Sequence, residues 1–170
     1  GSLGLALALA ILLDRLDRRF RYPDQVEKEL GLSILGAVPQ IRRRGKLSQS
    51  PEEAANVVEA FRTIRMNVTH TLGGEKGPVS LTISSPGPGD GKSLVSANLA
   101  LSFSEAGYQV VLVDCDIRRG ELHRSFGIER KPGLLDCLNG TAQVDHVLRS
   151  GGHPNLTVVP CGTRFERGPE

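Results

Sequence analysis

The residues best suited to chemistry form one glycine-rich stretch, residues 84–93, with the sequence SSPGPGDGKS. Glycines in such a stretch let backbone N–H groups turn inward around phosphate oxygens, because a side chain would block that approach. An apolar run precedes the stretch and a helical pattern follows it, so the N-terminus of a helix adds partial positive charge there. Lys92 can reach β- and γ-phosphates, and the Ser93 hydroxyl suits a magnesium ion. The sequence therefore predicts a loop that binds a nucleotide.

This loop departs from the strict phosphate-loop pattern at one position. The pattern has a glycine five residues before Gly91, where this chain has Pro86, with Gly87 next to it. The GxGKS core remains between an expected strand and an expected helix, and in that setting a chance glycine-rich turn is the weaker interpretation. The expected nucleotide contacts are Gly87, Gly89, Asp90, Gly91, Lys92, Ser93 and Leu94.

Two carboxylates follow the next apolar run. Asp114 and Asp116 stand two residues apart at its carboxyl end, where open α/β sheets bind ligands. Beside a phosphate loop they could hold magnesium through water, and one could accept a proton from an attacking hydroxyl. An aspartate that only caps the next turn is the alternative. We predict metal support from Ser93, Asp114 and Asp116, and catalytic roles for Lys92, Asp114 and Asp116.

A helix that begins near Pro51 is expected ahead of this region. Ser50 is a good N-cap, and proline is favoured in the first turn of a helix. Apolar residues then recur at steps of three and four, which predicts one buried face. The expected buried positions are Ala54, Val57, Val58, Phe61, Ile64, Val68 and Leu72.

Strands and helices alternate from residue 79 onward, which predicts an α/β fold. The run QVVLVDCD is almost continuously apolar, as expected for a parallel strand covered on both faces. Glycine at position 107 should end the helix that follows the phosphate loop. The expected strands are 79–84, 109–116 and 155–160, and the expected helices are 94–107 with short ones within 133–140 and 142–150.

The N-terminal segment, residues 3–13, is an uncharged apolar run of eleven residues. About 20 apolar residues are needed to cross a bilayer, so a buried helix or a signal-peptide core is the alternative. Arginines follow the run directly, as at the cytoplasmic end of a membrane helix. We therefore expect residues 1–13 to be the C-terminal part of a transmembrane helix.

Residues 14–47 contain nine basic and five acidic residues, a net charge of +4. We expect a basic juxtamembrane linker there, which could lie on anionic lipid, and a solvated loop is the alternative. Within it, the pattern predicts a short helix that ends at Gly31 and a short strand through Val38. Residues 48–170 then form the remaining domain.

Composition excludes several classes of protein. The whole chain has 21 Lys and Arg against 19 Asp and Glu, so nucleic-acid binding through overall charge is excluded. A hydrophobic fraction of 39% excludes wholesale disorder. Cys115, Cys137 and Cys161 show neither disulfide nor zinc-site spacing, which predicts reduced thiols, and we expect Cys115 to be buried and inert.

With these motifs in place, residues 84–127 resemble the bacterial tyrosine kinases, or BY-kinases, of exopolysaccharide and capsule export. Those enzymes pair a Walker A loop with a "Walker A-prime" DxD on the following strand. The resemblance extends to GLLDCLNG, to NLTVVPCG and to an ExxRxxR motif at Glu59, Arg62 and Arg65. Residues 13–39 are similar to the stretch that joins the second membrane helix of chain-length-determinant proteins to a fused kinase.

The resemblance implies a P-loop NTPase fold, a three-layer α/β sandwich with a mostly parallel sheet. It implies that Lys92 and Ser93 bind ATP and Mg2+, that Asp114 helps to activate a tyrosine hydroxyl, and that Asp116 supports the water shell of the metal. Glu59, Arg62 and Arg65 would contact a neighbouring subunit of a homo-oligomer. A solvated helix face is the alternative for these three residues.

The chain also departs from the family pattern. No apolar strand ending in DxxP and no tyrosine-rich tail follow, since Tyr22 and Tyr108 are the only tyrosines. We therefore expect an incomplete, truncated kinase domain over 48–170, with weak activity or none by itself.

The expected function is an ATP-dependent tyrosine autokinase that regulates polysaccharide biosynthesis and export. The expected location is the cytoplasmic face of the bacterial inner membrane, with a transmembrane activator region in the same or a partner chain and no nucleic-acid partner. One alternative is a membrane-associated P-loop ATPase without kinase activity, but related partitioning ATPases carry a lysine where this chain has Gly87. The other is a structural chain-length regulator whose domain is gated by nucleotide.

Overall fold

The computed structural model describes residues 4, 6, 27–29, 31–39, 51–73 and 77–163. The chain divides into two compact units, residues 1–35 and 36–170. The expected end of a membrane helix (1–13) and the expected basic linker (14–47) lie mostly outside the described residues. Within the ranges just given, no helix has the length and apolar character needed to cross a membrane.

In the first unit, residues 27–29 are helical, and the N–H of Gly31 donates to the carbonyl of Glu27 at 3.1 Å. Gly31 has a φ of +63°, which glycine adopts readily, so the helix ends at the predicted residue. The predicted strand through Val38 is wrong, because residues 31–39 are not in a strand. The N–H of Ile34 donates instead to Glu27 Oε1 at 3.2 Å, and an isolated strand without a neighbour is unstable.

The long helix α3, Pro51–Thr71, is the first helix described in the second unit. Proline at its first position and two acidic residues in its first turn suit the N-terminus of a helix. Of the seven positions predicted to be buried, only Phe61, Ile64 and Val68 are, whereas Val58 is 44% exposed. Helix α3 packs against α4 (Lys92–Glu105), and the segment at Gly36 also lies against Ile64, so only a narrow stripe of α3 is buried.

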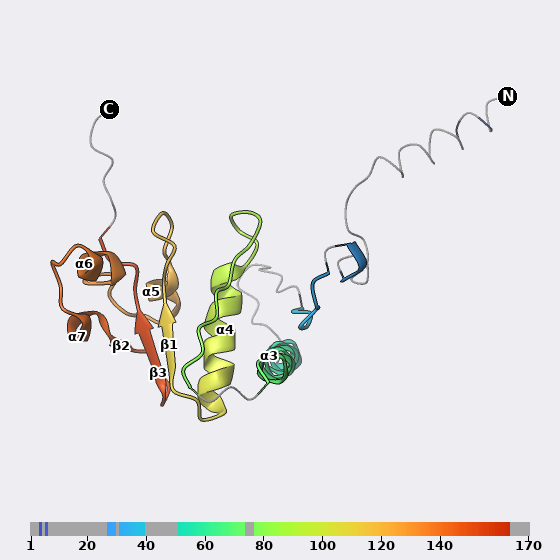
Figure 1. Ribbon diagram of the computed structural model, residues 1–170, viewed down its shortest axis with the longest axis horizontal. Helices are drawn as coiled ribbons and strands as arrows, with labels where there is room; N and C mark the ends of the chain where they lie inside the picture. The colour runs from blue at the N-terminus through green and yellow to red at the C-terminus, as the bar shows by residue number, and fades with distance from the viewer. Residues whose placement is uncertain are drawn as a thin grey trace. The chain divides into compact units, whose positions relative to one another are not determined.

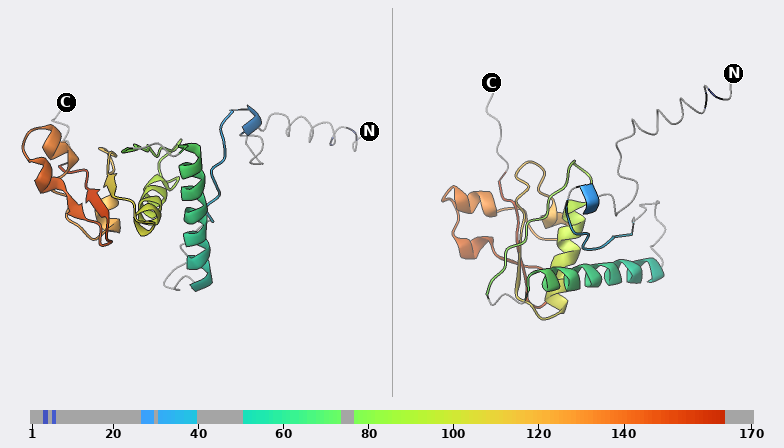
Figure 2. Two further views of the ribbon diagram at one scale, coloured as in Figure 1. Left: turned by 60° about the horizontal axis from the view of Figure 1, so that its bottom comes forward. Right: turned by 45° about the vertical axis from the view of Figure 1, so that its right-hand side comes forward.

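Helix α4 lies between α3 and the sheet (Figure 1 and Figure 2). It begins after Gly91 and is followed by Gly107, whose φ of +90° turns the chain towards the first strand as predicted. Four of its five buried residues are alanine or serine, and these small side chains allow close packing. The five are Ala97, Leu99, Ala100, Ser102 and Ser104.

The sheet has three strands, β1 (Val110–Val113), β2 (Arg149–Ser150) and β3 (Leu156–Val159), in the order β1-β3-β2. Strands β1 and β3 are parallel, with Val110 opposite Leu156 and Val113 opposite Val159, while β2 is antiparallel to β3. The core between the sheet and α4 contains Ala100, Leu156 and Val158. The described strands therefore confirm the predicted α/β fold, with a mixed sheet.

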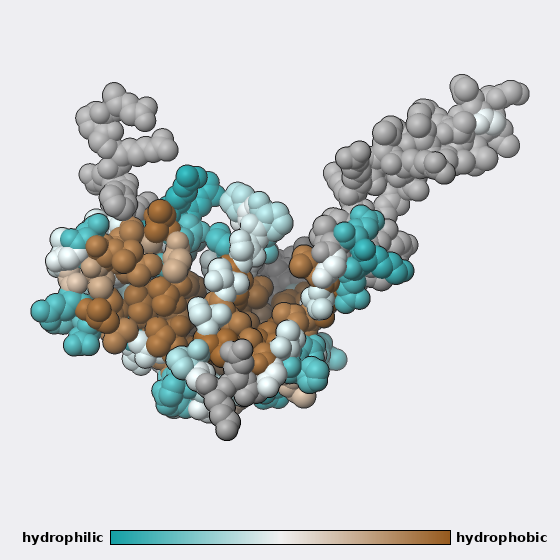
Figure 3. All heavy atoms as spheres, in the orientation of Figure 1, coloured by the Kyte–Doolittle hydropathy of each residue, from teal (hydrophilic) through white to brown (hydrophobic). Residues whose placement is uncertain are grey.

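Two expectations about the strands are wrong. Residues 79–84 are not in a strand, because none of the described strands pairs with them, and Val79 and Leu81 remain 43% and 47% exposed. Strand β1 is not covered on both faces, since Val111 and Val113 are 60% and 38% exposed. Figure 3 shows a broad hydrophobic surface on the face where the strands lie in Figure 1.

Three short helices complete the unit: α5 (Leu122–Ser125), α6 (Leu134–Leu138) and α7 (Val144–Val147). Helices α6 and α7 lie within the predicted segments, whereas α5 and β2 were not predicted. The N-terminus of α6 docks on the end of β3, because the N–H groups of Leu134 and Leu135 donate to the carbonyls of Pro160 and Cys161. This contact fixes the carboxyl end of β3.

Asp136 stabilises the same contact between the N-terminus of α6 and the segment that follows β3. Its Oδ2 accepts the N–H groups of Gly133 and Thr163 at 2.8 and 3.1 Å, and its Oδ1 accepts the hydroxyl of Thr163. Burial acts to raise the pKa of Asp136, but the hydrogen bonds from Thr163 and Gly133 outweigh it and leave the pKa below 3.8. The ionised carboxylate therefore contributes stability at neutral pH.

We predict that Asp136→Asn lowers the free energy of unfolding by about 1–2 kcal/mol at pH 7, because the amide cannot accept all three hydrogen bonds. A folded-state pKa that is depressed gives stability above the unfolded-state pKa, and this stability is lost as the pH falls through the folded-state value. The difference between wild type and variant should therefore shrink below pH 4. Urea unfolding at pH 7 and at pH 3 measures it, with the exposed Asp145→Asn as control. A difference that is the same at both pH values would contradict the assignment.

Candidate nucleotide-binding site

The glycine-rich loop, residues 86–93, connects the extended segment 77–85 to α4. Gly89 and Gly91 have φ values of +90° and +95°, which favour glycine at both positions. The carboxylate of Asp90 braces the loop, because its Oδ2 accepts the N–H of Gly87 at 2.7 Å. Gly91 O accepts the N–H of Val95 at 2.9 Å and so starts the helix. The loop thus stands at the N-terminus of a 14-residue helix, as a phosphate-binding loop requires.

Lys92 and Asp116, distant in sequence, form an ion pair with 2.9 Å between Nζ and Oδ2. The other oxygen of Asp116 accepts the N–H of Arg119 at 2.9 Å. The hydrogen bond from Lys92 is the largest of the causes that lower the pKa of Asp116. The structure therefore brings together the loop and the second carboxylate of the DxD motif. In Figure 1 the start of α4 and the carboxyl end of β1 lie at the same end of the unit.

Asp114 is only 3% exposed. Its Oδ1 accepts the N–H of Asp116 at 3.2 Å, and its Oδ2 accepts the N–H of Leu122 at 3.1 Å. Burial raises the pKa of this carboxyl. Asp114 therefore organises the turn that carries Asp116, and its predicted role in activating a hydroxyl stays a prediction.

The residues around the loop fit a magnesium ion that is bound together with a phosphate. Magnesium is usually held by one or two carboxylates, with phosphates and water as the remaining ligands. Asp116 is an ionised carboxylate that already faces a cation, and the Ser93 hydroxyl lies one residue into α4. Among the described residues, no group of three or more His, Cys, Asp or Glu side chains could hold a metal.

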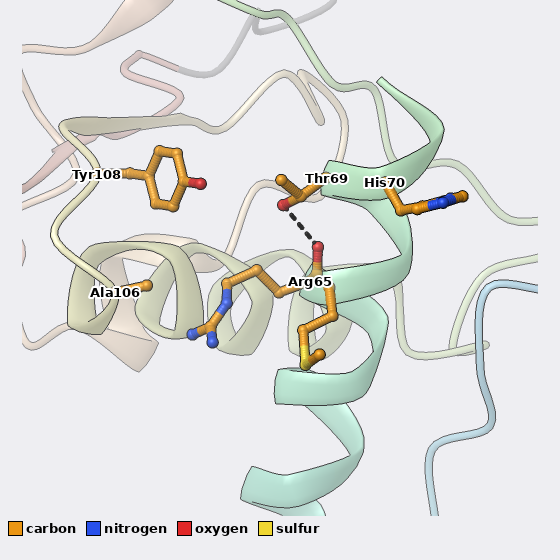
Figure 4. A pocket seen from close by; sticks show the side chains of 6 residues that line it. Arg65, Thr69, His70, Ala106 and Tyr108 are labelled. Carbon is orange, nitrogen blue, oxygen red and sulfur yellow. Dashed lines mark hydrogen bonds between the residues drawn. The ribbon is translucent and has the colours of Figure 1, made fainter. Parts of the chain in front are cut away.

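The structure separates the three residues of the ExxRxxR motif. Glu59 and Arg62 pair with one another on the outer side of α3, where their side chains are 65% and 50% exposed. Arg65 reaches towards α4 (Figure 4), where its Nη1 donates to the Ser102 carbonyl at 2.6 Å. It borders an open pocket of about 440 Å3 whose other lining residues are Met66, Thr69, His70, Ala106 and Tyr108.

This separation predicts different effects for the two arginines. Arg65→Ala should lower the free energy of unfolding by about 1–2 kcal/mol, because it removes a charge-assisted hydrogen bond to Ser102. Arg62→Ala should leave stability unchanged, since exposed ion pairs contribute little, and should reduce the size of any oligomer. Urea unfolding and light scattering after size-exclusion chromatography measure the two effects. Wild-type stability of Arg65→Ala would contradict the first expectation, and an unchanged oligomer in Arg62→Ala would leave Glu59 and Arg62 as a solvated helix face.

Sequence reasoning missed Arg130, which lies between α5 and α6. Its Nε donates to the Gly162 carbonyl at 2.7 Å and its Nη1 to the Gly120 carbonyl at 2.8 Å. No local motif marks such a residue, because both partners are backbone carbonyls 10 and 32 residues away. The expectation for Cys115 was also wrong: it is exposed, since it alternates with the buried Asp114 at the end of β1.

Comparison with known proteins agrees with this geometry. Residues 81–150 match the CobQ/CobB/MinD/ParA nucleotide binding domain. Over 93% of this chain, the sequence is 29% identical to the tyrosine-protein kinase ptk of Acinetobacter johnsonii. Over 95% of this chain, it is 29% identical to the tyrosine-protein kinase wzc of Salmonella typhimurium. These matches cover 23% and 25% of the two relatives, so the chain spans about a quarter of their length.

Solved structures of tyrosine kinase domains are also similar to this chain. The BceF tyrosine kinase domain superposes with a TM-score of 0.70 at 29% identity, over 84% of this chain and 62% of that domain. The kinase domain of the Escherichia coli tyrosine kinase ETK superposes with a TM-score of 0.71 at 26% identity, over 86% of this chain and 60% of that domain. The chain therefore has the P-loop α/β fold of bacterial tyrosine kinase domains, and its residues 81–150 are similar to nucleotide binding domains of the CobQ/CobB/MinD/ParA type.

Proposed function

We propose that this chain provides the ATP-binding part of a bacterial protein-tyrosine autokinase that acts in exopolysaccharide or capsule export. The observation that carries the proposal is the ion pair between Lys92 of the glycine-rich loop and Asp116 of the DxD motif, at 2.9 Å. It joins the two sequence motifs of the BY-kinases into one site at the N-terminus of α4. The tyrosine kinases similar to this chain support the proposed reaction.

The residues have the following roles in phosphoryl transfer. The N–H groups of the loop and the N-terminus of α4 bind the phosphates, and Lys92 moves from Asp116 to their oxygens. Asp116 and the hydroxyl of Ser93 would hold Mg2+, which would supply charge neutralisation on the phosphates. Asp114 is the proposed acceptor for the proton of the attacking tyrosine hydroxyl. Positioning and charge neutralisation then do most of the catalytic work.

The proposed setting is the cytoplasmic face of the bacterial inner membrane. There the kinase domains of neighbouring copies would meet through the ExxRxxR helix, so that one copy phosphorylates another. The exposed Glu59–Arg62 pair on α3 is available for such a contact. A transmembrane activator region, in the same or a partner chain, would hold the copies together.

Phosphotyrosine in the source bacterium tests this proposal. The gene product is isolated from cells that carry the wild-type gene or Lys92→Met, and it is probed for phosphotyrosine by immunoblotting and mass spectrometry. We expect phosphotyrosine on the wild-type protein and none on the variant, with Lys131→Met as a control that keeps it. Equal phosphotyrosine in wild type and Lys92→Met would overturn the proposal, and its absence from the wild type would favour an ATPase or a structural regulator.

A further inference from the structure

Arg130 joins the two segments that follow the parallel strands β1 and β3. Gly162 follows β3 and Gly120 follows β1, and the guanidinium donates to both carbonyls through different nitrogens, Nε and Nη1. The third nitrogen, Nη2, is buried and has no hydrogen-bond partner among the residues the structure describes. The side chain is therefore held by two backbone carbonyls, one from the segment after each parallel strand.

The contact at Gly120 leads directly to Asp116. The N–H of Gly120 donates to the carbonyl of Asp116 at 2.6 Å, which closes a turn over residues 116–120. A Cβ at Gly120 would lie 2.6 Å from the Cβ of Cys161 and 2.8 Å from Asp114 Oδ2, so this turn has no free space beneath it. Holding the Gly120 carbonyl thus holds the backbone that presents the Asp116 carboxylate to Lys92.

The glycine-rich loop itself does not depend on this contact. Neither hydrogen bond of Arg130 reaches residues 86–93, and the loop is braced internally by Asp90. A change at Arg130 should therefore displace the carboxylate side of the site and leave the phosphate-binding side intact. The contribution of each side to nucleotide affinity can be measured separately, by titrating the nucleotide in the absence and in the presence of magnesium.

We propose that Arg130 is a positioning residue that holds the 116–120 turn so that Asp116 can support the metal of a bound magnesium–nucleotide complex. The inference rests on the proposed function, since the ligand is the nucleotide of that site. Residues that orient metal-supporting groups affect metal binding although they do not touch the metal. The planar guanidinium suits this task, because its nitrogens can serve two acceptors at once, whereas a lysine ammonium on a flexible stem is less well oriented.

The test measures the affinity of the whole chain for ADP, by isothermal titration calorimetry, in EDTA and in excess MgCl2. For Arg130→Gln we expect the gain in affinity that magnesium provides to fall by about tenfold, with the affinity in EDTA unchanged. Arg130→Lys should recover part of the gain, because an ammonium can still donate to one of the carbonyls. Arg124→Gln is the matched control, since Arg124 forms an exposed pair with Glu121 at 3.0 Å and should behave as wild type.

Several results would overturn the inference. Arg130→Gln with the wild-type gain from magnesium would do so, and so would an equal loss in EDTA and in magnesium, which indicates a role in the fold alone. If Arg130→Gln does not fold, Arg130→Lys decides: a reduced gain with unchanged affinity in EDTA supports the inference, and an unchanged gain overturns it. If the wild-type chain binds ADP neither in EDTA nor in magnesium, the proposed nucleotide-binding function is overturned, and with it the role of Arg130. This result is distinguishable from a change seen only in the Arg130 variants.

Discussion

Replacing Lys92 with methionine is expected to weaken binding of ADP by the chain by about 10- to 100-fold in the presence of magnesium. A hydrogen bond to a charged group contributes about 1.5–3 kcal/mol, and each 1.4 kcal/mol corresponds to a factor of ten in affinity. Methionine matches the alkyl stem of lysine but has no ammonium to place on the phosphates. Isothermal titration calorimetry measures the affinity.

Lys131→Met serves as the control for this experiment, because it removes one positive charge from an exposed residue outside the site. It should bind ADP as the wild type does. Urea unfolding of both variants checks that they are folded under the conditions of the titration. Wild-type affinity in a folded Lys92→Met variant would contradict the assignment of the loop.

Gly133→Ala is expected to lower the free energy of unfolding by about 3 kcal/mol or to prevent folding. A Cβ at this position would lie 2.3 Å from the carbonyl oxygen of Pro160 and 2.4 Å from the N of Gly162. Both are backbone atoms at the exit of β3, so no side chain can move away to make room. The φ of Gly133 is −148°, which any residue adopts, and the whole cost therefore comes from the contact.

Gly127→Ala is a control that introduces backbone strain without a steric contact. Gly127 has a φ of +62° and nothing within 4 Å of an added Cβ, so alanine there should cost only about 1 kcal/mol. Urea unfolding of both variants gives the comparison. If Gly133→Ala were as stable as Gly127→Ala, the close approach of α6 to the exit of β3 would be contradicted.

The parts of the site that the sequence predicts are those with a local signal. The glycine-rich loop before α4 and the DxD at the end of β1 each follow from a short motif in the right order of elements. The ion pair between Lys92 and Asp116 could be anticipated because both motifs lie where α/β sheets bind ligands. Helix ends at Gly31 and Gly107 were likewise predictable, since positive φ values favour glycine.

The parts that the sequence did not predict depend on contacts between distant segments. Residues 79–84 have the alternation and composition of a strand. A strand forms only when a neighbouring strand accepts and donates its backbone hydrogen bonds, and the local sequence does not specify that neighbour. The exposure of Val111 follows from the same cause, because apolar character alone does not specify what covers a face. Arg130 has no motif, and its role arises only when the ends of β1 and β3 meet.

Arg65 illustrates a third limit. Its spacing from Glu59 and Arg62 suggests one shared surface, yet the structure directs Arg65 to the Ser102 carbonyl of α4 while the other two pair on the outside. Residues three apart on a helix lie about 60° away from one another around its axis, which is enough to separate an inner from an outer position at the border of a buried stripe. A motif defined by spacing can therefore combine a structural residue with two that are free to contact a partner.

An NMR titration of the isotopically labelled chain with ADP and Mg2+ tests whether residues 86–93 and the DxD turn form one nucleotide site. If they do, the largest shifts of backbone amide signals occur at Gly87, Gly89 to Ser93 and Asp114 to Asp116. Little change is expected around the pocket bordered by Arg65 and Tyr108, at the other end of α4. Shifts concentrated at that pocket, or no shifts in the loop at saturating nucleotide, would contradict a nucleotide site formed by the loop and the turn.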